Sequence, residues 1–162
     1  MKTFAFITFG CKVNQYEGQA LREELARRDY REVSPGHNAD LYILNTCTVT
    51  ETAAREAEQL VRQLHRRHPT ASFTITGCAA DSERDAFLGL PAVRGVIPHD
   101  QKHRLPDLLE ESPEAPALPL RARSKTRDRD IFSLRISRFD QHTRAFLKIE
   151  DGCDLCCTFC II

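Results

Sequence analysis

The chain of 162 residues has no long apolar run and no excess of charge of either sign. No stretch approaches the roughly 20 apolar residues that cross a bilayer, so we expect no membrane-spanning segment. The first apolar run, Phe4–Phe9, is too short for a signal peptide, and no small-residue cleavage site follows it. Lys and Arg together number 23, as do Asp and Glu, so the overall charge indicates no particular partner. We therefore expect a cytoplasmic protein.

Cysteine is the residue type that this chain does have in quantity, with seven copies. Disulfides are rare in the reducing cytoplasm, and nothing here resembles a secretory signal. Metal binding or redox chemistry is the better explanation for so many thiols.

The N-terminal part of the chain alternates between short apolar runs and segments of helical periodicity. The expected strands are Phe4–Phe9, Leu41–Leu44, Phe73–Thr76 and Val93–Ile97, with a further strand within Tyr30–Val33. The expected helices are Gln19–Arg28, Thr50–His65, Asp81–Leu88 and Leu105–Glu111. Asn14 and Glu17 have the spacing of a capping box before the first helix. Repeated βα units with buried strands predict an α/β fold, an open parallel sheet with helices on both faces.

The composition changes at Ser112. Three prolines that follow, Pro113, Pro116 and Pro119, break any helix. Residues 121–144 then carry eight Arg or Lys against three Asp, a balance that suits either a phosphate backbone or a solvated linker. Phe146–Ile149 indicates a new strand that runs into the last cysteines. We expect a domain over residues 1–111, a partly basic linker over 112–143, and the start of another domain over 144–162.

Three cysteines occupy equivalent places in the N-terminal domain. Cys11, Cys47 and Cys78 each follow a predicted strand and precede a predicted helix. The carboxyl ends of parallel strands meet at one edge of a sheet, where ligands bind in open α/β folds. Helix N-termini there favour thiolates, and Gly10 and Gly77 suit a close approach of the backbone. These cysteines are either ordinary buried residues or a set of three metal ligands. Three ligands would leave one iron of a 4Fe-4S cluster open.

The last ten residues contain another trio. Cys153, Cys157 and Cys160 give the spacing C-x3-C-x2-C, which places three thiolates on one short loop. Such a loop can hold three irons of a 4Fe-4S cluster and leave the fourth iron free for a substrate. The same segment contains two C-x2-C pairs, Cys153 with Cys156 and Cys157 with Cys160, which could form a zinc site instead. Zinc pairs normally stand about a dozen residues apart, and here no spacer separates them.

Two further residues of this loop have open interpretations. Cys156 is treated as a bystander in the cluster hypothesis. Phe159 lies between two of the proposed ligands, where an aromatic ring can pack against a nucleoside bound at the open iron. Ordinary packing would explain an aromatic side chain there equally well.

These cysteines with their neighbours resemble the radical S-adenosylmethionine (SAM) methylthiotransferases. The matching motifs are Gly10-Cys-Lys-Val-Asn14, Asn45-Thr-Cys47, Thr76-Gly-Cys78 and the loop Gly152–Ile162. The resemblance covers the whole chain. Within the family, the chain resembles the branch that acts on threonylcarbamoyladenosine in tRNA, through the segments Thr8–Glu17, Thr46–Thr50 and Arg144–Cys153.

The resemblance implies a flavodoxin-like N-terminal domain, then a radical-SAM barrel and an RNA-binding β-barrel. It implies an auxiliary 4Fe-4S cluster on Cys11, Cys47 and Cys78, and a radical-SAM 4Fe-4S cluster on Cys153, Cys157 and Cys160. It further implies that a radical made from SAM activates carbon 2 of the modified adenine beside the tRNA anticodon, and that the auxiliary cluster supplies the sulfur. The implied partners are the tRNA anticodon stem-loop and an electron donor such as flavodoxin or ferredoxin.

This sequence departs from the family pattern in three respects. Ala79 and Cys156 replace aromatic residues that are common beside the third and fifth cluster cysteines, and neither change removes a ligand. The third is length: only the first barrel strand and the cluster loop follow the linker, so we expect a truncated chain that is inactive alone. The alternative is a non-catalytic module that binds an iron-sulfur cluster or zinc.

Overall fold

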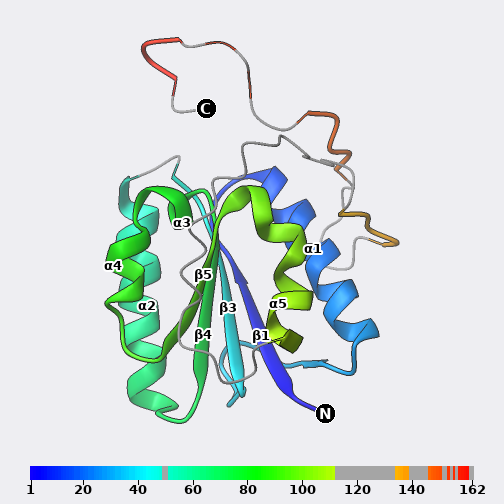
Figure 1. Cartoon of the computed structure of the whole chain (residues 1–162), viewed down its shortest axis with the longest axis vertical. Coiled ribbons are helices and arrows are strands. Elements are labelled where there is room, and N and C mark those ends of the chain that lie inside the picture. Colours follow the sequence, from blue (N-terminus) through cyan, green and yellow to red (C-terminus); the bar gives the residue numbers. More distant parts are fainter. Residues whose placement is uncertain are drawn as a thin grey trace.

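The structure is a computed structural model that describes residues 1–48, 51–111, 134–138, 146–150, 153, 155 and 157–160. Its centre is a five-stranded sheet in which every neighbouring pair of strands is parallel (Figure 1). The strands are β1 (Thr3–Thr8), β2 (Arg31–Glu32), β3 (Leu41–Thr46), β4 (Ser72–Gly77) and β5 (Val93–Ile97). Their order in the sheet is β2-β1-β3-β4-β5, the order of flavodoxin-like folds.

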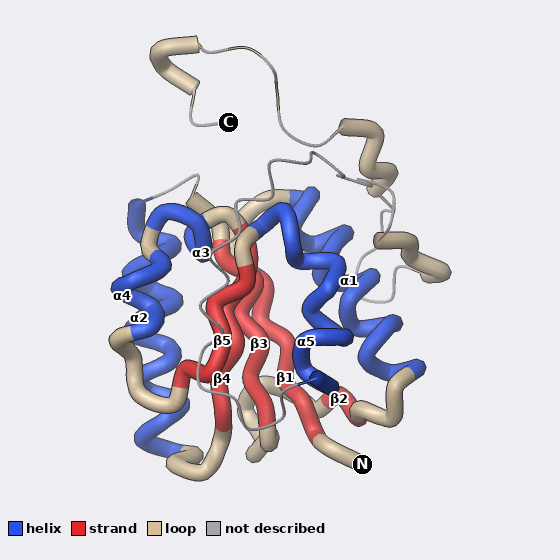
Figure 2. The backbone as a smooth tube through the Cα atoms, viewed as in Figure 1, coloured by secondary structure: helices blue, strands red, loops and turns tan. Residues whose placement is uncertain are grey.

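Helices cover both faces of this sheet (Figure 2). They are α1 (Lys12–Arg27), α2 (Glu51–Arg67), α3 (Ala79–Ser82), α4 (Arg84–Leu88) and α5 (Leu105–Glu111), with a 3-10 helix, η1, at His99–Arg104. Two hydrophobic clusters correspond to the two faces. One packs α1 and α5 on the sheet through Leu21, Leu25 and Leu105, and the other packs α2, α3 and α4 through residues such as Val61 and Phe87. Every residue of β3 is buried, as expected of a central parallel strand.

The α/β fold with a parallel sheet and helices on both faces is therefore confirmed. Two local predictions within this domain are wrong. The first helix begins at Lys12 rather than near Gln19, so Asn14 lies inside α1 and does not cap it; Cys11 is the N-cap residue. The predicted helix Asp81–Leu88 is divided into α3 and α4, which are interrupted at Glu83.

The expected strand at Phe146–Ile149 is not formed, because residues 146–150 have no regular secondary structure. A strand needs a hydrogen-bonded neighbour, and none pairs with this segment within the described part of the chain. Its apolar side chains Leu147 and Ile149 are largely exposed. Most of the expected linker, residues 112–133 and 139–143, lies outside the described residues, so the domain boundaries stay predictions. Where the chain is described, no helix combines the length and apolar character that crossing a membrane requires.

Candidate metal centre

Three cysteines meet the carboxyl edge of the sheet. Cys11 follows β1, Cys47 follows β3 and Cys78 follows β4, as predicted. In the strand order of this sheet, the connections diverge between β1 and β3, because the chain leaves β1 toward β2 and leaves β3 toward β4. Ligands in open α/β sheets bind outside the carboxyl ends of the strands at such a switch point. Cys11 and Cys47 flank this point.

Two glycines allow the cysteine turns to touch. Gly10 and Gly77 have φ angles of +86° and +97°, which L side chains rarely adopt. A Cβ on Gly10 would lie 2.5 Å from the sulfur of Cys47, so the Cys11 turn lies directly against Cys47. A Cβ on Gly77 would lie 2.2 Å from the Thr46 carbonyl oxygen. The sequence therefore brings the three turns into contact by omitting side chains at these points.

The Cys78 thiol is influenced by its burial and by its charged neighbours. Burial raises the pKa of the Cys78 thiol; Lys102 opposes this shift, while Cys47 and Cys11 add to it. The expectation that a helix N-terminus favours the thiolate is not met at Cys78, because burial is the largest influence on the pKa of this thiol and raises it. Cys47 is buried, Cys78 is partly exposed and Cys11 is exposed. A metal that binds Cys78 must displace a proton.

Asparagine side chains tie the Cys11 turn to the Cys47 turn. The Asn14 amide donates hydrogen bonds to the carbonyl oxygens of Phe9, at 3.0 Å, and Thr46, at 2.8 Å. The Asn45 amide in turn donates to the Asn14 carbonyl at 2.9 Å. Both asparagines are fully buried. The asparagines of the Gly-Cys-Lys-Val-Asn and Asn-Thr-Cys motifs thus have a physical role, which is to hold two cysteine-bearing turns together.

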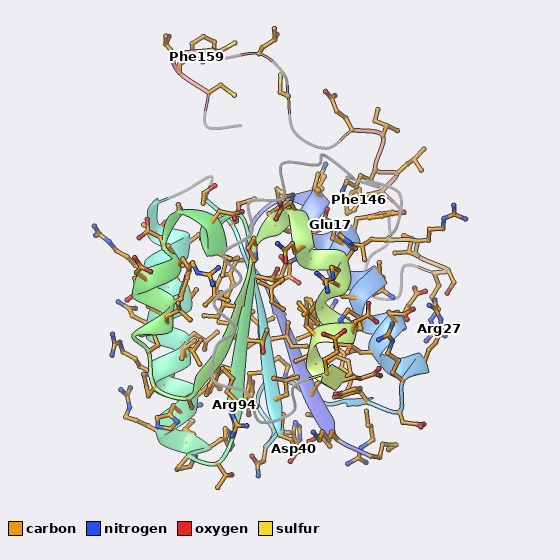
Figure 3. The ribbon with its side chains drawn as sticks, in the orientation of Figure 1. Glu17, Arg27, Asp40, Arg94, Phe146 and Phe159 are labelled. Atoms are coloured by element: carbon orange, nitrogen blue, oxygen red, sulfur yellow. The ribbon has the colours of Figure 1, made fainter. Side chains whose placement is uncertain are left out.

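A buried ion-pair network lies beside these turns. The Glu17 carboxylate accepts hydrogen bonds from Lys102 at 2.6 Å and from Lys148 at 2.5 Å, and the Lys102 ammonium also reaches the Asn14 side-chain oxygen at 3.3 Å. Burial acts to raise the pKa of Glu17, but the two lysines together outweigh it and the pKa is lowered. Figure 3 shows Glu17 near the end of α1 that meets the carboxyl edge of the sheet.

Sequence reasoning missed this network. The sequence pattern places Glu17 in a capping box, and it singles out neither Lys102 nor Lys148. The motif that contains Asn14 and Glu17 marks both as unusual polar residues near a cysteine, but no sequence signal identifies their lysine partners. The partners come from η1 and from residues 146–150, which are 85 and 131 positions away from Glu17.

The C-terminal trio lies on an exposed loop. Cys153, Cys157 and Cys160 are all exposed, and the Cys160 amide donates to the Cys157 carbonyl at 3.1 Å, which closes a turn. The Leu155 amide donates to the Cys153 sulfur at 3.4 Å, a contact of the kind that tunes thiolate ligands. Figure 1 shows the described part of this loop beyond the carboxyl edge of the sheet.

Phe159 is 92% exposed (Figure 3), so no described side chain covers it. Its predicted packing against SAM stays a prediction, as do the ligand roles of both cysteine trios. Cys156 lies outside the described residues.

The fit of these residues to an iron-sulfur cluster rests on donor chemistry. Among the described residues, no three His, Cys, Asp or Glu side chains lie close enough together to hold a single metal ion. A cluster of four irons is wider than one ion and is held by thiolates around its outside, which suits three thiols on neighbouring strand ends. At the same strand ends, the buried hydroxyl of Thr76 and that of Thr8 have no hydrogen-bond partner in the described part of the chain. Hydroxyl donors can bond to cluster sulfur.

Comparison with known proteins shows the family to which this chain belongs. Residues 3–97 match the model of the uncharacterized protein family UPF0004, and the chain belongs to this family. The chain is also 35% identical over 161 residues to the threonylcarbamoyladenosine tRNA methylthiotransferase MtaB of Chlamydia pneumoniae. The aligned region covers 99% of this chain and 35% of that protein.

Other relatives are similar to the same extent. The MtaB protein of Bacillus subtilis strain 168 is 33% identical over 100% of this chain and 36% of its own length. The tRNA-2-methylthio-N(6)-dimethylallyladenosine synthase of Sphingopyxis alaskensis is 33% identical over 99% of this chain and 36% of its own length. The resemblance to methylthiotransferases, and to the threonylcarbamoyladenosine branch among them, is confirmed. The chain spans about a third of the length of the curated relatives that it matches.

Proposed function

We propose that this chain supplies both cluster-binding cysteine trios of a tRNA-modifying methylthiotransferase, which adds a methylthio group to carbon 2 of threonylcarbamoyladenosine beside the anticodon. The observation that carries the proposal is the placement of Cys11, Cys47 and Cys78 at the carboxyl ends of three neighbouring strands, β1, β3 and β4. That arrangement accompanies the similarity to relatives named as methylthiotransferases of threonylcarbamoyladenosine.

Each trio has a separate role in this proposal. Cys11, Cys47 and Cys78 would hold an auxiliary 4Fe-4S cluster, and Cys153, Cys157 and Cys160 a radical-SAM 4Fe-4S cluster. When bound, these groups supply reducing electrons, a binding place for SAM and the sulfur atom. The residues of this chain contribute thiolates, the asparagine bridges that orient two of the cysteine turns, and a buried lysine whose charge favours an anionic thiolate site. Phe159 is proposed to pack against the adenine of SAM.

The first experiment measures iron, zinc and acid-labile sulfide per chain after anaerobic reconstitution. We expect about eight irons and eight sulfides in the wild-type chain, and about four of each after replacing either trio with alanine. Cys156→Ala is the matched control, since it removes a thiol from the same loop and should leave the count unchanged.

The rival function is a non-catalytic metal-binding module, and the same measurement separates it from the proposal. Zinc near one per chain with little sulfide would mean a structural site and would contradict the radical mechanism. About four irons that disappear only with the Cys11, Cys47 and Cys78 variant would leave the N-terminal domain as a cluster-binding module.

SAM binding tests the catalytic half of the proposal. We expect SAM to change the electron paramagnetic resonance spectrum of the reduced chain when Cys153, Cys157 and Cys160 are intact, including in the Cys11, Cys47 and Cys78 variant. The variant without the C-terminal trio should not respond. No response in the wild-type chain would remove the radical-SAM assignment while leaving cluster binding intact.

The substrate is tested on cellular tRNA. Deleting the gene that encodes this chain should abolish 2-methylthio-threonylcarbamoyladenosine and leave threonylcarbamoyladenosine in its place, as measured by mass spectrometry of tRNA nucleosides. Loss of a 2-methylthio isopentenyladenosine instead would assign the protein to the other tRNA branch. Unchanged methylthio nucleosides would overturn the proposed activity.

A further inference from the structure

Two described segments that follow the N-terminal domain, residues 134–138 and 146–150, contact α1 at several points along its length. The backbone amide and hydroxyl of Ser137 both donate to Glu23, each at 2.8 Å. Lys148 then pairs with Glu17, which is nearer to the start of α1. As the chain advances from 137 to 148, its contacts therefore move toward the N-terminal end of α1. That end begins next to Cys11 and meets the carboxyl edge of the sheet.

A ring contact adds to the attachment at this end. The Lys12 ammonium lies 5.2 Å from the centre of the Phe146 ring, a distance at which a cation and an aromatic face attract. In the view of Figure 3, Phe146 and Glu17 both appear at the end of α1 that meets the carboxyl edge of the sheet. Residues 146–150 thus touch the start of α1 at two places, although they form no strand with the sheet.

The strongest of these contacts is the one at Glu17, because it is buried. The exposed fractions of the Glu17 and Lys148 side chains are 3% and 4%. Lys102, which pairs with the other carboxylate oxygen, is 2% exposed. One carboxylate shared by two ammonium groups forms a joint between α1, η1 and the segment that precedes the cysteine loop. Removing one member of a buried set costs much more than removing an exposed ion pair, because a charge loses its compensation.

This joint limits where the C-terminal cysteines can lie. Cys153 follows Lys148 by five residues, which span at most about 18 Å when fully extended. Glu17 follows Cys11 by six residues of helix, a rise of about 9 Å. The joint therefore tethers the loop within a short distance of the edge that carries Cys11 and its two partners. Two groups that must both act on one substrate atom need such proximity.

We propose that Glu17 is a positioning residue, which fixes the segment before the C-terminal cysteine loop to the start of α1 and so holds the two cysteine trios near each other. What the trios bind rests on the proposed function; the joint itself does not. Lys102 and Lys148 are its two cationic members. The proposal concerns the relative placement of the trios and assigns Glu17 no contact with a substrate.

The joint is tested in the metal-free chain by hydrogen–deuterium exchange. Lys148→Ala removes the segment's side of the joint and leaves the Glu17–Lys102 pair, so the N-terminal domain stays folded. We expect amides in peptides that contain Ser137 or Lys148 to exchange about tenfold faster, as local opening predicts, while β1, β3 and β4 keep their protection. Lys148→Arg should restore slow exchange, and Arg135→Ala, an exposed charge on the same segment, should have no effect. Equal exchange in Lys148→Ala and wild type would overturn the joint.

A second readout follows the distance between the trios. In the reconstituted and reduced chain, we expect the two paramagnetic groups to broaden each other's resonance signals. Lys148→Ala should abolish that coupling with the iron content still about eight per chain, and Lys148→Arg should retain it. Coupling that persists in Lys148→Ala would overturn the positioning role. A wild-type chain with fewer irons would instead count against the proposed function, and the exchange result would stand independently.

Discussion

The buried side-chain amide of Asn14 helps to connect the turns of Cys11 and Cys47. The Asn14 side chain bonds to two main-chain carbonyls and to Lys102, so replacing it leaves three polar groups with a lost partner, one part-buried and two buried. We expect Asn14→Ala to lower the free energy of unfolding by about 3 kcal/mol, since each unsatisfied buried group costs about 1–3 kcal/mol. Chemical denaturation of the metal-free chain measures this. The same substitution at the exposed Asn38 should change stability by less than about 0.5 kcal/mol, and equal effects at both sites would contradict the bridging role.

The turn before Cys11 depends on the absence of a side chain. Gly10→Ala places a methyl group 2.3 Å from the Cys47 Cβ at a φ of +86°. We expect a loss of about 2–4 kcal/mol of stability from backbone strain and overpacking. Displacement of Cys47 should also reduce iron binding at the N-terminal trio. Denaturation and iron analysis check both effects. Gly36→Ala is the control, because an added Cβ there meets nothing within 4 Å; a Gly10 variant that behaves like it would disprove the close approach.

At the level of elements, one carboxylate joins α1, η1 and residues 146–150. The pKa of Glu17 is lowered from its ordinary value of 4.5, because Lys102 and Lys148 together outweigh the effect of burial. A depressed pKa means that the ion pairs stabilise the fold above pH 4.5 and lose this contribution as the pH falls through the folded-state pKa. Glu17→Gln should therefore be less stable than wild type by about 3 kcal/mol at pH 7, and the difference should shrink below pH 4.5.

Denaturation at several pH values measures that difference. Glu111→Gln is the control, because it replaces an exposed carboxylate at the end of α5. The stability difference between Glu17→Gln and the wild type could instead stay constant from pH 7 to well below pH 4.5. That result would show that packing, not charge, explains the loss of stability.

The elements that the sequence predicts well are those that bury apolar side chains. The strands β1 and β3 contain continuous apolar runs, β4 and β5 contain apolar residues typical of strands, and α2 has a clear apolar stripe, so the sequence predicts all of them to within a few residues. The start of α1 was placed too late because its first turns bury Asn14, Glu17 and Gly18, which hydrophobic periodicity does not detect. The strand expected at Phe146–Ile149 failed for a different reason, since apolar alternation alone does not provide a pairing partner.

Part of the candidate site could likewise be predicted from the sequence, and part of it could not. The gathering of Cys11, Cys47 and Cys78 could be predicted, because strand ends of a parallel sheet share one edge whatever the side chains do. The joint at Glu17 could not be predicted, because it brings together residues 85 and 131 positions apart. This contact depends on how η1 and residues 146–150 pack against α1. Neither segment has a local sequence pattern that predicts the contact.

At the level of the whole molecule, the two cysteine trios differ in what they tie together. Ligands at Cys11, Cys47 and Cys78 come from three separate βα units, so a group bound to all three links the sheet across most of its width. The C-terminal ligands lie on one exposed loop and link only that loop. A ligand that binds only the folded state raises stability with the logarithm of its concentration relative to its dissociation constant. The stability that a bound group adds to the sheet should therefore depend on Cys11, Cys47 and Cys78 only.

We expect anaerobic reconstitution to raise the melting temperature of the wild-type sheet by roughly 10 °C, the effect of 2–3 kcal/mol on a domain of this size. The Cys153/Cys157/Cys160→Ser variant should keep this gain, because its N-terminal trio is intact. The Cys11/Cys47/Cys78→Ser variant should lose it and melt at the same temperature with or without iron and sulfide. Circular dichroism at a helix wavelength follows the transition, since the helices of regular length lie in the N-terminal domain of the described chain. An equal gain in both variants would mean that iron stabilises the protein by some route other than joining the strand ends of the sheet.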